Sequence, residues 1–413
     1  MRRRGANLPT IGGFNQAVVF DIVRRASGGV SRTEITAQTD LSAQTVSNVA
    51  RRLLDGGLVR EGDKVSSGPG KPRTTLHLVP DARLAIGIHL DPARITYSIV
   101  DLLGRVVARH STATPGGQAP GDVEQSMIST TRSLIEQGDV DPRRIIGIGV
   151  AAPGPVDIER GSVNDPPLLP GWNDVPLRDA LADAFDMPTV LVKDVTSATV
   201  GELWAGGHEQ AGGDLAVFYM GSGVGLGIAL EHTALRGATA NLGDIGHLRV
   251  SSGGPVCKCG RRGCLGDAVS PARIVNAAAA MGAGEAVAPS DHAAVAIAFA
   301  AMCDRADADE AVRGLLDELA EHIAEAVTQI VNLLDVSTVV MSGPIWAEAA
   351  RHTLEGVRSR VAASTALVLP HPVSIVDSAL GPDAAAVGAG CQVLESAFAL
   401  GDPSPFTRRA LTA

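Results

Sequence analysis

The 413-residue chain contains few aromatic residues and few cysteines. Aromatic side chains make up only 3% of it, which argues against a protein that stacks unpaired nucleic-acid bases. Its apolar runs fall far short of the roughly 20 residues that span a bilayer, and no apolar segment follows the basic N-terminal residues. Five cysteines are too few, and odd in number, for a disulfide framework. We therefore expect a cytoplasmic protein without a membrane span or signal peptide.

Charge is distributed unevenly along the chain. The formal net charge is −10, yet residues 1–80 carry 12 Lys/Arg against 6 Asp/Glu, and the rest carries 23 against 39. A basic segment on an acidic body indicates that only the segment contacts a polyanion. The hydrophobic fraction of 45% is enough for a sizeable core, and the length is typical of two or three domains.

Three helices followed by two strands are predicted in the basic segment. An amphipathic helix is expected over about 13–26, a second opens with the capping box of Ser31 and Glu34, and a third is capped by Ser42. Strands at 58–60 and 74–78 would flank a glycine- and proline-rich tip. This order predicts a winged helix-turn-helix domain over residues 1–80. An ordinary helical domain with a solvated charged face is the alternative.

The third helix, together with the wing, would present groups that read duplex DNA. Amide side chains can bond adenine edges, and a guanidinium can bond guanine in the major groove. Cations at the wing tip can approach a phosphate or the minor groove. The residues expected to contact DNA are Ser42, Gln44, Thr45, Ser47, Asn48, Arg51, Arg52, Lys71 and Arg73.

After residue 80 the pattern changes to alternating strands and helices. Apolar, strand-like runs occur at 84–90, 145–150, 190–192, 215–220 and 336–341, and each leads into a loop that carries glycine or a carboxylate. Such a pattern indicates an open α/β sheet that binds ligands at the carboxyl ends of its strands. Two halves of this kind imply two lobes.

Four short motifs stand out in this body, at residues 153–157, 170–177, 243–247 and 257–265. Together they resemble the ROK family, which combines repressors and sugar kinases. The resemblance covers about residues 12–395 and implies a winged helix-turn-helix followed by a two-lobed actin-like ATPase fold, that of ROK sugar kinases. It further implies lobes at 81–199 and 200–382, with a final helix at about 383–400 that packs back on the first lobe.

One histidine and three closely spaced cysteines form a candidate metal site. One imidazole and three thiolates provide the closed tetrahedral shell of structural zinc, without an open position for catalysis. Buried free thiols are the alternative interpretation. The resemblance also implies zinc at these positions, whereas Cys303 and Cys391 are expected in the core. The predicted ligands are His247, Cys257, Cys259 and Cys264.

Departures from the motifs of the family's kinases predict that kinase chemistry has been lost. Asp194 matches the catalytic base of the family's kinases, although it could also cap the following helix. The kinase phosphate motif Asp-x-Gly-Gly-Thr is replaced by His89, Leu90, Asp91, Pro92 and Ala93. This change adds a negative charge where phosphates would lie and removes a backbone donor. We expect no catalytic activity and a vestigial Asp194; an active ATP-dependent sugar kinase with a DNA-binding head is the alternative.

The same resemblance implies a carbohydrate site with an altered set of side chains. Lys193 replaces an asparagine of the kinases, so it could favour an acidic or phosphorylated sugar or pair with a nearby acid. Gly266 stands where the kinases have glutamate, which argues against simple glucose recognition. The residues expected to bind the effector are Pro153, Gly154, Lys193, Asp194, Asp244 and His247.

These expectations combine into one hypothesis. The chain is interpreted as a sugar-responsive transcriptional regulator, foremost a repressor of carbohydrate uptake or catabolism genes. Its partners would be double-stranded operator DNA and a carbohydrate or sugar-derivative effector, and its cofactor structural zinc. The resemblance implies a homodimer or homotetramer. A regulator that senses a phosphorylated metabolite or a partner protein is a further alternative.

Overall fold

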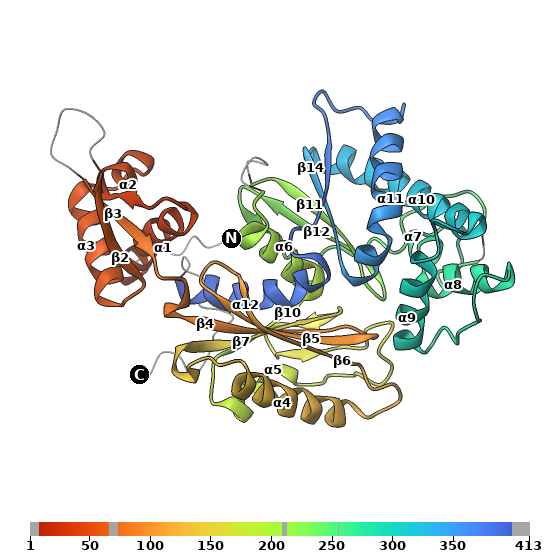
Figure 1. Ribbon diagram of the computed structural model, residues 1–413, viewed down its shortest axis with the longest axis horizontal. Coiled ribbons are helices and arrows are strands. Elements are labelled where there is room, and N and C mark those ends of the chain that lie inside the picture. The colour runs from red at the N-terminus through yellow and green to blue at the C-terminus, as the bar shows by residue number, and fades with distance from the viewer. Residues whose placement is uncertain (1–7, 66–72, 209–212, 255, 399–413) are drawn as a thin grey trace.

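The computed structural model describes residues 8–65, 73–208, 213–254 and 256–398. Figure 1 shows a small N-terminal domain, which we call the head, beside a larger body of two lobes. Among the described helices, none combines the length and the apolar composition needed to cross a membrane.

The head contains the predicted helices and hairpin. Its elements are α1 (Leu8–Arg25), β1 (Val30–Ser31), α2 (Arg32–Gln38), α3 (Ala43–Asp55), β2 (Val59–Val65) and β3 (Arg73–Leu78), and its antiparallel sheet has the order β1-β3-β2. The first helix begins at Leu8, earlier than the predicted start near residue 13. The two-residue strand β1 was not predicted because a strand so short has no detectable alternation.

Two caps define the helix-turn-helix. Ser31 Oγ accepts a hydrogen bond from Glu34 N at 3.3 Å, while Glu34 Oε2 accepts one from Ser31 N at 2.8 Å, which is the predicted capping box. At the start of α3, Ser42 Oγ accepts a bond from Thr45 N at 3.2 Å. The two helices then bury their apolar faces, with Ile35 of α2 fully enclosed.

The first lobe is a five-stranded mixed sheet. Its order is β10-β7-β4-β5-β6, formed by β4 (Leu84–Leu90), β5 (Arg94–Asp101), β6 (Val106–Ala113), β7 (Ile145–Ala152) and β10 (Thr189–Lys193). The strands β7 and β10 run parallel to β4, so their carboxyl ends meet at one edge. Figure 1 shows α4 (Pro120–Gln137) and α5 (Leu177–Phe185) on one face of this sheet. A short hairpin, β8 (Val156–Asp157) and β9 (Ser162–Val163), follows β7.

The second lobe repeats this plan with a sheet of order β13-β12-β11-β14-β15. Its strands are β11 (Leu215–Met220), β12 (Val224–Leu230), β13 (Thr233–Ala234), β14 (Thr338–Ser342) and β15 (Ser374–Asp377). Its helices are α7 (Leu265–Ala268), α8 (Pro271–Ala280), α9 (His292–Cys303), α10 (Glu310–Leu334) and α11 (Pro344–Ala363). The apolar stripe of α10 and the thiol of Cys303 lie in the core of this lobe. Short 3-10 turns complete the described chain at Pro80–Ala82, Pro142–Arg144 and Gly381–Asp383.

Two helices, α6 (Asp194–Ala205) and α12 (Ala384–Phe398), cross at the centre of the body. A Cβ on Gly388 of α12 would lie 1.7 Å from the Ser197 carbonyl oxygen of α6, so the helix backbones are in contact. A Cβ on Gly87 of β4 would similarly lie 1.9 Å from the Ala386 carbonyl oxygen. Glycine therefore allows α12 to pack closely on the first-lobe sheet, although it follows the second lobe in sequence.

Candidate functional site

Four side chains of the second lobe form a compact candidate metal centre. The ligand atoms of His247, Cys257, Cys259 and Cys264 all lie within 4.8 Å of one another. The distance from His247 Nδ1 to Cys257 Sγ is 3.5 Å, and the two other sulfur atoms are 3.6 Å apart. A tetrahedral zinc ion with Zn–S bonds of about 2.3 Å separates its sulfur ligands by about 3.8 Å. The donor set and its spacing therefore fit zinc.

The loop geometry explains how these donors converge. Gly263 has a φ of 74°, and a Cβ there would lie 1.8 Å from the Ser251 carbonyl oxygen, so the tight approach requires glycine. Arg261 donates to Cys259 Sγ at 3.4 Å and lowers the pKa of that thiol to about 6. At neutral pH, Cys259 is therefore favoured as the thiolate that binds metal.

The metal loop is joined to the segment that carries His247. Leu265 N donates to the Leu248 carbonyl at 2.7 Å, and Gly266 N donates to the Gly246 carbonyl at 2.8 Å. An ion held by the cysteines would thus stabilise residues 243–247, one of the predicted walls of the effector site. The His247 side chain itself lies with the cysteines.

The other predicted effector residues gather where the two lobes meet. Gly154 lies after β7, and a Cβ there would lie 3.1 Å from Lys193 Cε and 3.0 Å from Asn241 Oδ1. Pro153 precedes this glycine, while Asp244 is exposed and its Oδ1 accepts a bond from Gly246 N at 3.1 Å. The adjoining Gly243 places its backbone against Leu226 and Val195, beside the start of α6. Segments distant in sequence thus form one candidate site.

Among the described residues, Lys193 bonds backbone carbonyls and no neighbouring acid. Its Nζ donates to the carbonyl oxygens of Asn241 and Leu242, both at 3.2 Å. The Asn241 side chain in turn accepts a bond from Val156 N at 2.7 Å and donates to Val156 O at 2.8 Å. The ammonium therefore connects β10 of the first lobe to a segment of the second. Sequence reasoning missed Asn241, because a lone amide in a loop carries no local signal of such a partner.

Asp194 begins a helix, and its carboxyl group has a raised pKa. It is the first residue of α6, and its Oδ1 accepts a bond from Val195 N at 2.7 Å. Burial raises the pKa of the Asp194 carboxyl to about 6, while the neighbouring Lys193 opposes this rise. Part of its surface remains accessible. At neutral pH the group is a carboxylate that can accept a hydrogen bond from a hydroxyl.

The stretch that stands in place of the kinase phosphate motif contains a carboxylate that is already bonded. Asp91, only 6% exposed, accepts bonds through Oδ1 from Ser222 Oγ at 2.6 Å and from Ala93 N at 2.8 Å. Its Oδ2 accepts a bond from Ser222 N at 3.1 Å, within the glycine loop 221–227. Burial lowers the pKa of the neighbouring His89 to about 4, so this ring is neutral at physiological pH.

The candidate DNA-binding surface follows one side of α3. The side chains of Gln44, Asn48, Arg51 and Arg52 are exposed, and Gln44 Nε2 donates to Asn48 Oδ1 at 3.1 Å. Thr45 and Ser47 are half-buried beside them, and Ser42 is exposed at the cap. Arg73 is exposed at the start of β3, whereas Lys71 falls outside the described residues. The exposed groups of α3 are suited to a nucleic-acid groove.

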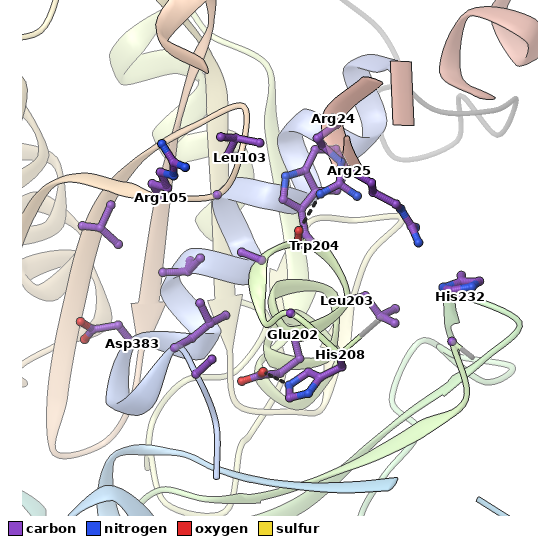
Figure 2. Close-up of a pocket in the computed structure, with 18 residues that line it drawn as sticks. Arg24, Arg25, Leu103, Arg105, Glu202, Leu203, Trp204, His208, His232 and Asp383 are labelled. Atoms are coloured by element: carbon purple, nitrogen blue, oxygen red, sulfur yellow. Dashed lines mark hydrogen bonds and ion pairs between the residues drawn. The ribbon is translucent and has the colours of Figure 1, made fainter. Parts of the chain in front are cut away.

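Head and body meet at a contact that the sequence did not reveal. Arg24 of α1 donates to the Trp204 carbonyl at 2.6 Å, and its guanidinium lies 4.2 Å from the centroid of the Trp204 ring. Figure 2 shows this pair at a pocket of about 430 Å³, which Glu202 and His208 also line. Because α6 runs from Asp194 to Ala205, one short helix connects the candidate effector site to the head.

Comparisons with known proteins agree with this architecture. The model of the ROK family matches residues 85–395. The chain is 29% identical over 236 residues to the xylose repressor of Caldicellulosiruptor bescii, which covers 57% of this chain and 59% of the relative. It thus spans less than two thirds of that relative's length. It is 25% identical to the DNA-binding transcriptional dual regulator NagC of Escherichia coli K12, over 82% of each chain.

Solved structures show the same fold. A ROK family transcriptional regulator described as a homolog of the E. coli MLC protein superposes with a TM-score of 0.71 at 21% identity, over 93% of this chain and 97% of its own. A ROK family glucokinase from Streptomyces griseus, in complex with glucose and AMPPNP, superposes with a TM-score of 0.61 at 24% identity, over 74% and 98%. Both the regulator and the kinase likeness therefore extend over the body.

Proposed function

Since the chain belongs to the ROK family, we propose that it is a sugar-responsive transcriptional repressor of carbohydrate uptake or catabolism genes. The observation that carries the proposal is the exposed polar face of α3 on a head that contacts the sensor body through Arg24 and Trp204. The names of the xylose repressor and of NagC support a regulatory role.

In this proposal the head binds duplex operator DNA. The helix α3 enters the major groove with base contacts from Gln44, Asn48 and Arg51, while Ser42, Thr45, Ser47 and Arg52 contact the backbone or neighbouring edges. The wing adds Lys71 and Arg73. We keep the proposed boundaries of 1–80 for this domain, and 81–199 and 200–382 for the lobes, with the final helix assigned to the first.

The body is proposed to sense a carbohydrate without phosphorylating it. Pro153, Gly154, Lys193, Asp194, Asp244 and the wall anchored by His247 form the effector site, with Asp194 as acceptor for a sugar hydroxyl. Asp194 also favours the second candidate, an active sugar kinase, because a carboxylate at this strand end can act as a general base. The bonded Asp91 in the phosphate region argues against that candidate.

The metal is proposed to be structural zinc. When bound by His247 and the three cysteines it supplies a rigid crosslink, and it leaves no open position for substrate. The chain's own contribution is the backbone pairing of residues 246–248 with residues 265–266, which transmits that rigidity to the effector wall.

The proposed signal passes through α6. An effector that prefers one arrangement of the lobes shifts the population toward it by its difference in affinity. Asp194 at the start of α6 and Trp204 near its end would move together, because a short helix is stiff. In a homodimer or homotetramer, two heads could then meet half-sites spaced by one helical turn of DNA, or by a multiple of it.

One experiment separates the candidates. A thermal-shift screen across sugars and their phosphates identifies the effector, since binding raises the melting temperature. Each hit is then tested for ATP turnover, with a ROK glucokinase as positive control, and for its effect on operator binding. We expect weakened DNA binding and no turnover. Turnover of any sugar would support the kinase, and hits that leave DNA binding unchanged would reject the sensor.

A further inference from the structure

The glycine loop between β11 and β12 presents the donors of an anion-binding site. Gly221 N bonds the Gly223 carbonyl at 2.8 Å, which forms a tight turn with Ser222 at its tip. Both the backbone N–H and the hydroxyl of Ser222 point to one partner. Loops that expose backbone N–H groups in this manner bind phosphates and other anions.

The partner of these donors comes from the other lobe. Asp91 lies in the turn between β4 and β5 of the first lobe, 131 residues before Ser222. The turn is held by Thr114 Oγ1, which donates to the Asp91 carbonyl at 2.6 Å, and by Asp91 N, which donates to the Arg94 carbonyl at 3.1 Å. The carboxylate is therefore fixed in place before it reaches across to the second lobe.

We infer that Asp91 is a built-in ligand of this glycine loop, which replaces a nucleotide phosphate and clamps the two lobes together without ATP. The carboxylate has the charge and the acceptor oxygens of a phosphate, and it uses the same kind of donors. The inference rests on the proposed function only in assuming that the body transfers no phosphate.

The surroundings of the clamp agree with a closed nucleotide site. Of the six buried side-chain polar atoms that lack a hydrogen-bond partner among the described residues, three are His89 Nε2, Tyr219 OH and Ser342 Oγ. They belong to β4, β11 and β14, and the His89 and Tyr219 rings meet edge to face at 6.1 Å. Tyr219 also lies beside the clamp, because a Cβ on Gly221 would contact both its ring and Asp91 Oδ2. Polar groups that a larger ligand could have bonded are thus enclosed.

The clamp has a counterpart on the effector side of the same junction. There the lobes are linked by Lys193 and Asn241, which bond backbone groups of the opposite lobe. With the glycine loop already bonded by Asp91, the proposed effector position remains open to an external ligand. The sensor should therefore respond to its effector with no dependence on nucleotide.

Hydrogen exchange of the full-length protein tests the clamp directly. We expect the Ser222 backbone amide to exchange about tenfold faster in Asp91→Asn. The side-chain nitrogen of asparagine cannot accept hydrogen bonds, so it would replace one of the two acceptor oxygens of the carboxylate. Ser222→Ala, a milder change that removes only the hydroxyl donor, should speed exchange of the amide at position 222 by a smaller factor. Asp101→Asn is the matched control: Asp101 is equally buried and accepts two backbone N–H bonds, but within its own lobe. It should leave Ser222 unchanged.

Nucleotide binding provides the second measurement. Wild-type protein should show no binding of Mg-ATP by calorimetry, whereas a variant with both Asp91→Gly and Pro92→Gly should bind Mg-ATP or inorganic phosphate. The clamp would be overturned if the Ser222 amide exchanged at the wild-type rate in Asp91→Asn. It would also be overturned if the wild type bound Mg-ATP and the exchange rate of Ser222 stayed the same after Mg-ATP was added. Sugar turnover by the wild type would instead overturn the proposed function, so the two failures are distinguishable.

Discussion

The exposed polar face of α3 and the junction between the lobes both contain many polar side chains. They differ in how far these side chains are buried and bonded. On α3, Arg51 and Arg52 are exposed. At the junction, Asp91 and Lys193 are buried and bonded to groups of the opposite lobe. Exposed cations keep their capacity for an external polyanion, whereas buried charges must be paired internally to offset desolvation. The exposed face of α3 therefore suits the proposed DNA contact, whereas the buried charges at the junction already have partners within the chain.

The candidate metal centre resembles neither the exposed face of α3 nor the bonded junction. Its four donor atoms lie within 4.8 Å of one another, an arrangement that suits an added cation. It therefore gives the largest expected effect. Cys259→Ser should reduce zinc from about one ion per chain to nearly none and lower the melting temperature, as measured by elemental analysis and thermal unfolding. Lys258→Ala, in the same loop, is the control and should keep the metal. Equal zinc content in both variants would reject the assignment.

The exposed polar face of α3 should respond next most strongly. Arg51→Ala should weaken operator binding by about 1–3 kcal/mol, since a bidentate base contact is lost, while the melting temperature stays nearly constant. A binding titration with operator and scrambled DNA measures the specific and non-specific affinities, and thermal unfolding measures the melting temperature. The matched control is Arg143→Ala, whose side chain is 89% exposed on the body. Unchanged operator affinity in Arg51→Ala would contradict the placement of α3 in the groove.

Effector binding should depend on pH through Asp194. Its pKa of about 6 means that the carboxylate is present above this value and lost as pH falls. An effector hydroxyl that donates to it should bind about tenfold more weakly at about pH 5 than at neutral pH. Asp194→Asn should remove this dependence and blunt the response, yet leave operator binding intact. Calorimetry at a series of pH values measures the effector affinity. If the affinity of Asp194→Asn changed with pH as steeply as that of the wild type, another group would be responsible for the pH dependence.

The contact between head and body should show the smallest effect. Arg24→Ala removes the bond to the Trp204 carbonyl and the stacking on its ring, which together couple α1 to α6. We expect the effector to shift operator affinity a few-fold less than in the wild type, with both separate affinities retained. Arg25→Ala is the matched control because its guanidinium pairs with Asp21 of the same helix. If the effector changed operator affinity by the same factor in both variants, the Arg24–Trp204 contact would not transmit the signal.

Local signals made much of the molecule predictable. The caps at Ser31 and Ser42 and the glycines after Asp55 located the helix-turn-helix, because capping depends on residues within one turn. The candidate metal site was predictable because three of its ligands fall within eight residues. The position of Asp194 at a strand end followed from the apolar run before it. The start of α1 was placed too late because its first turn lacks a clear apolar period.

The remaining features depended on contacts between distant segments. Lys193 and Asn241 are 48 residues apart, Asp91 and Ser222 are 131 apart, and Arg24 and Trp204 are 180 apart. The sequence alone determined which side chains this chain possesses and which short segments form caps, helices and the cysteine loop. Only the tertiary structure decided that Asp91 meets the glycine loop and that Lys193 bonds carbonyls instead of an acid. The physical reason is that such pairings follow from how the two lobes pack around α6 and α12, which no short-range pattern encodes.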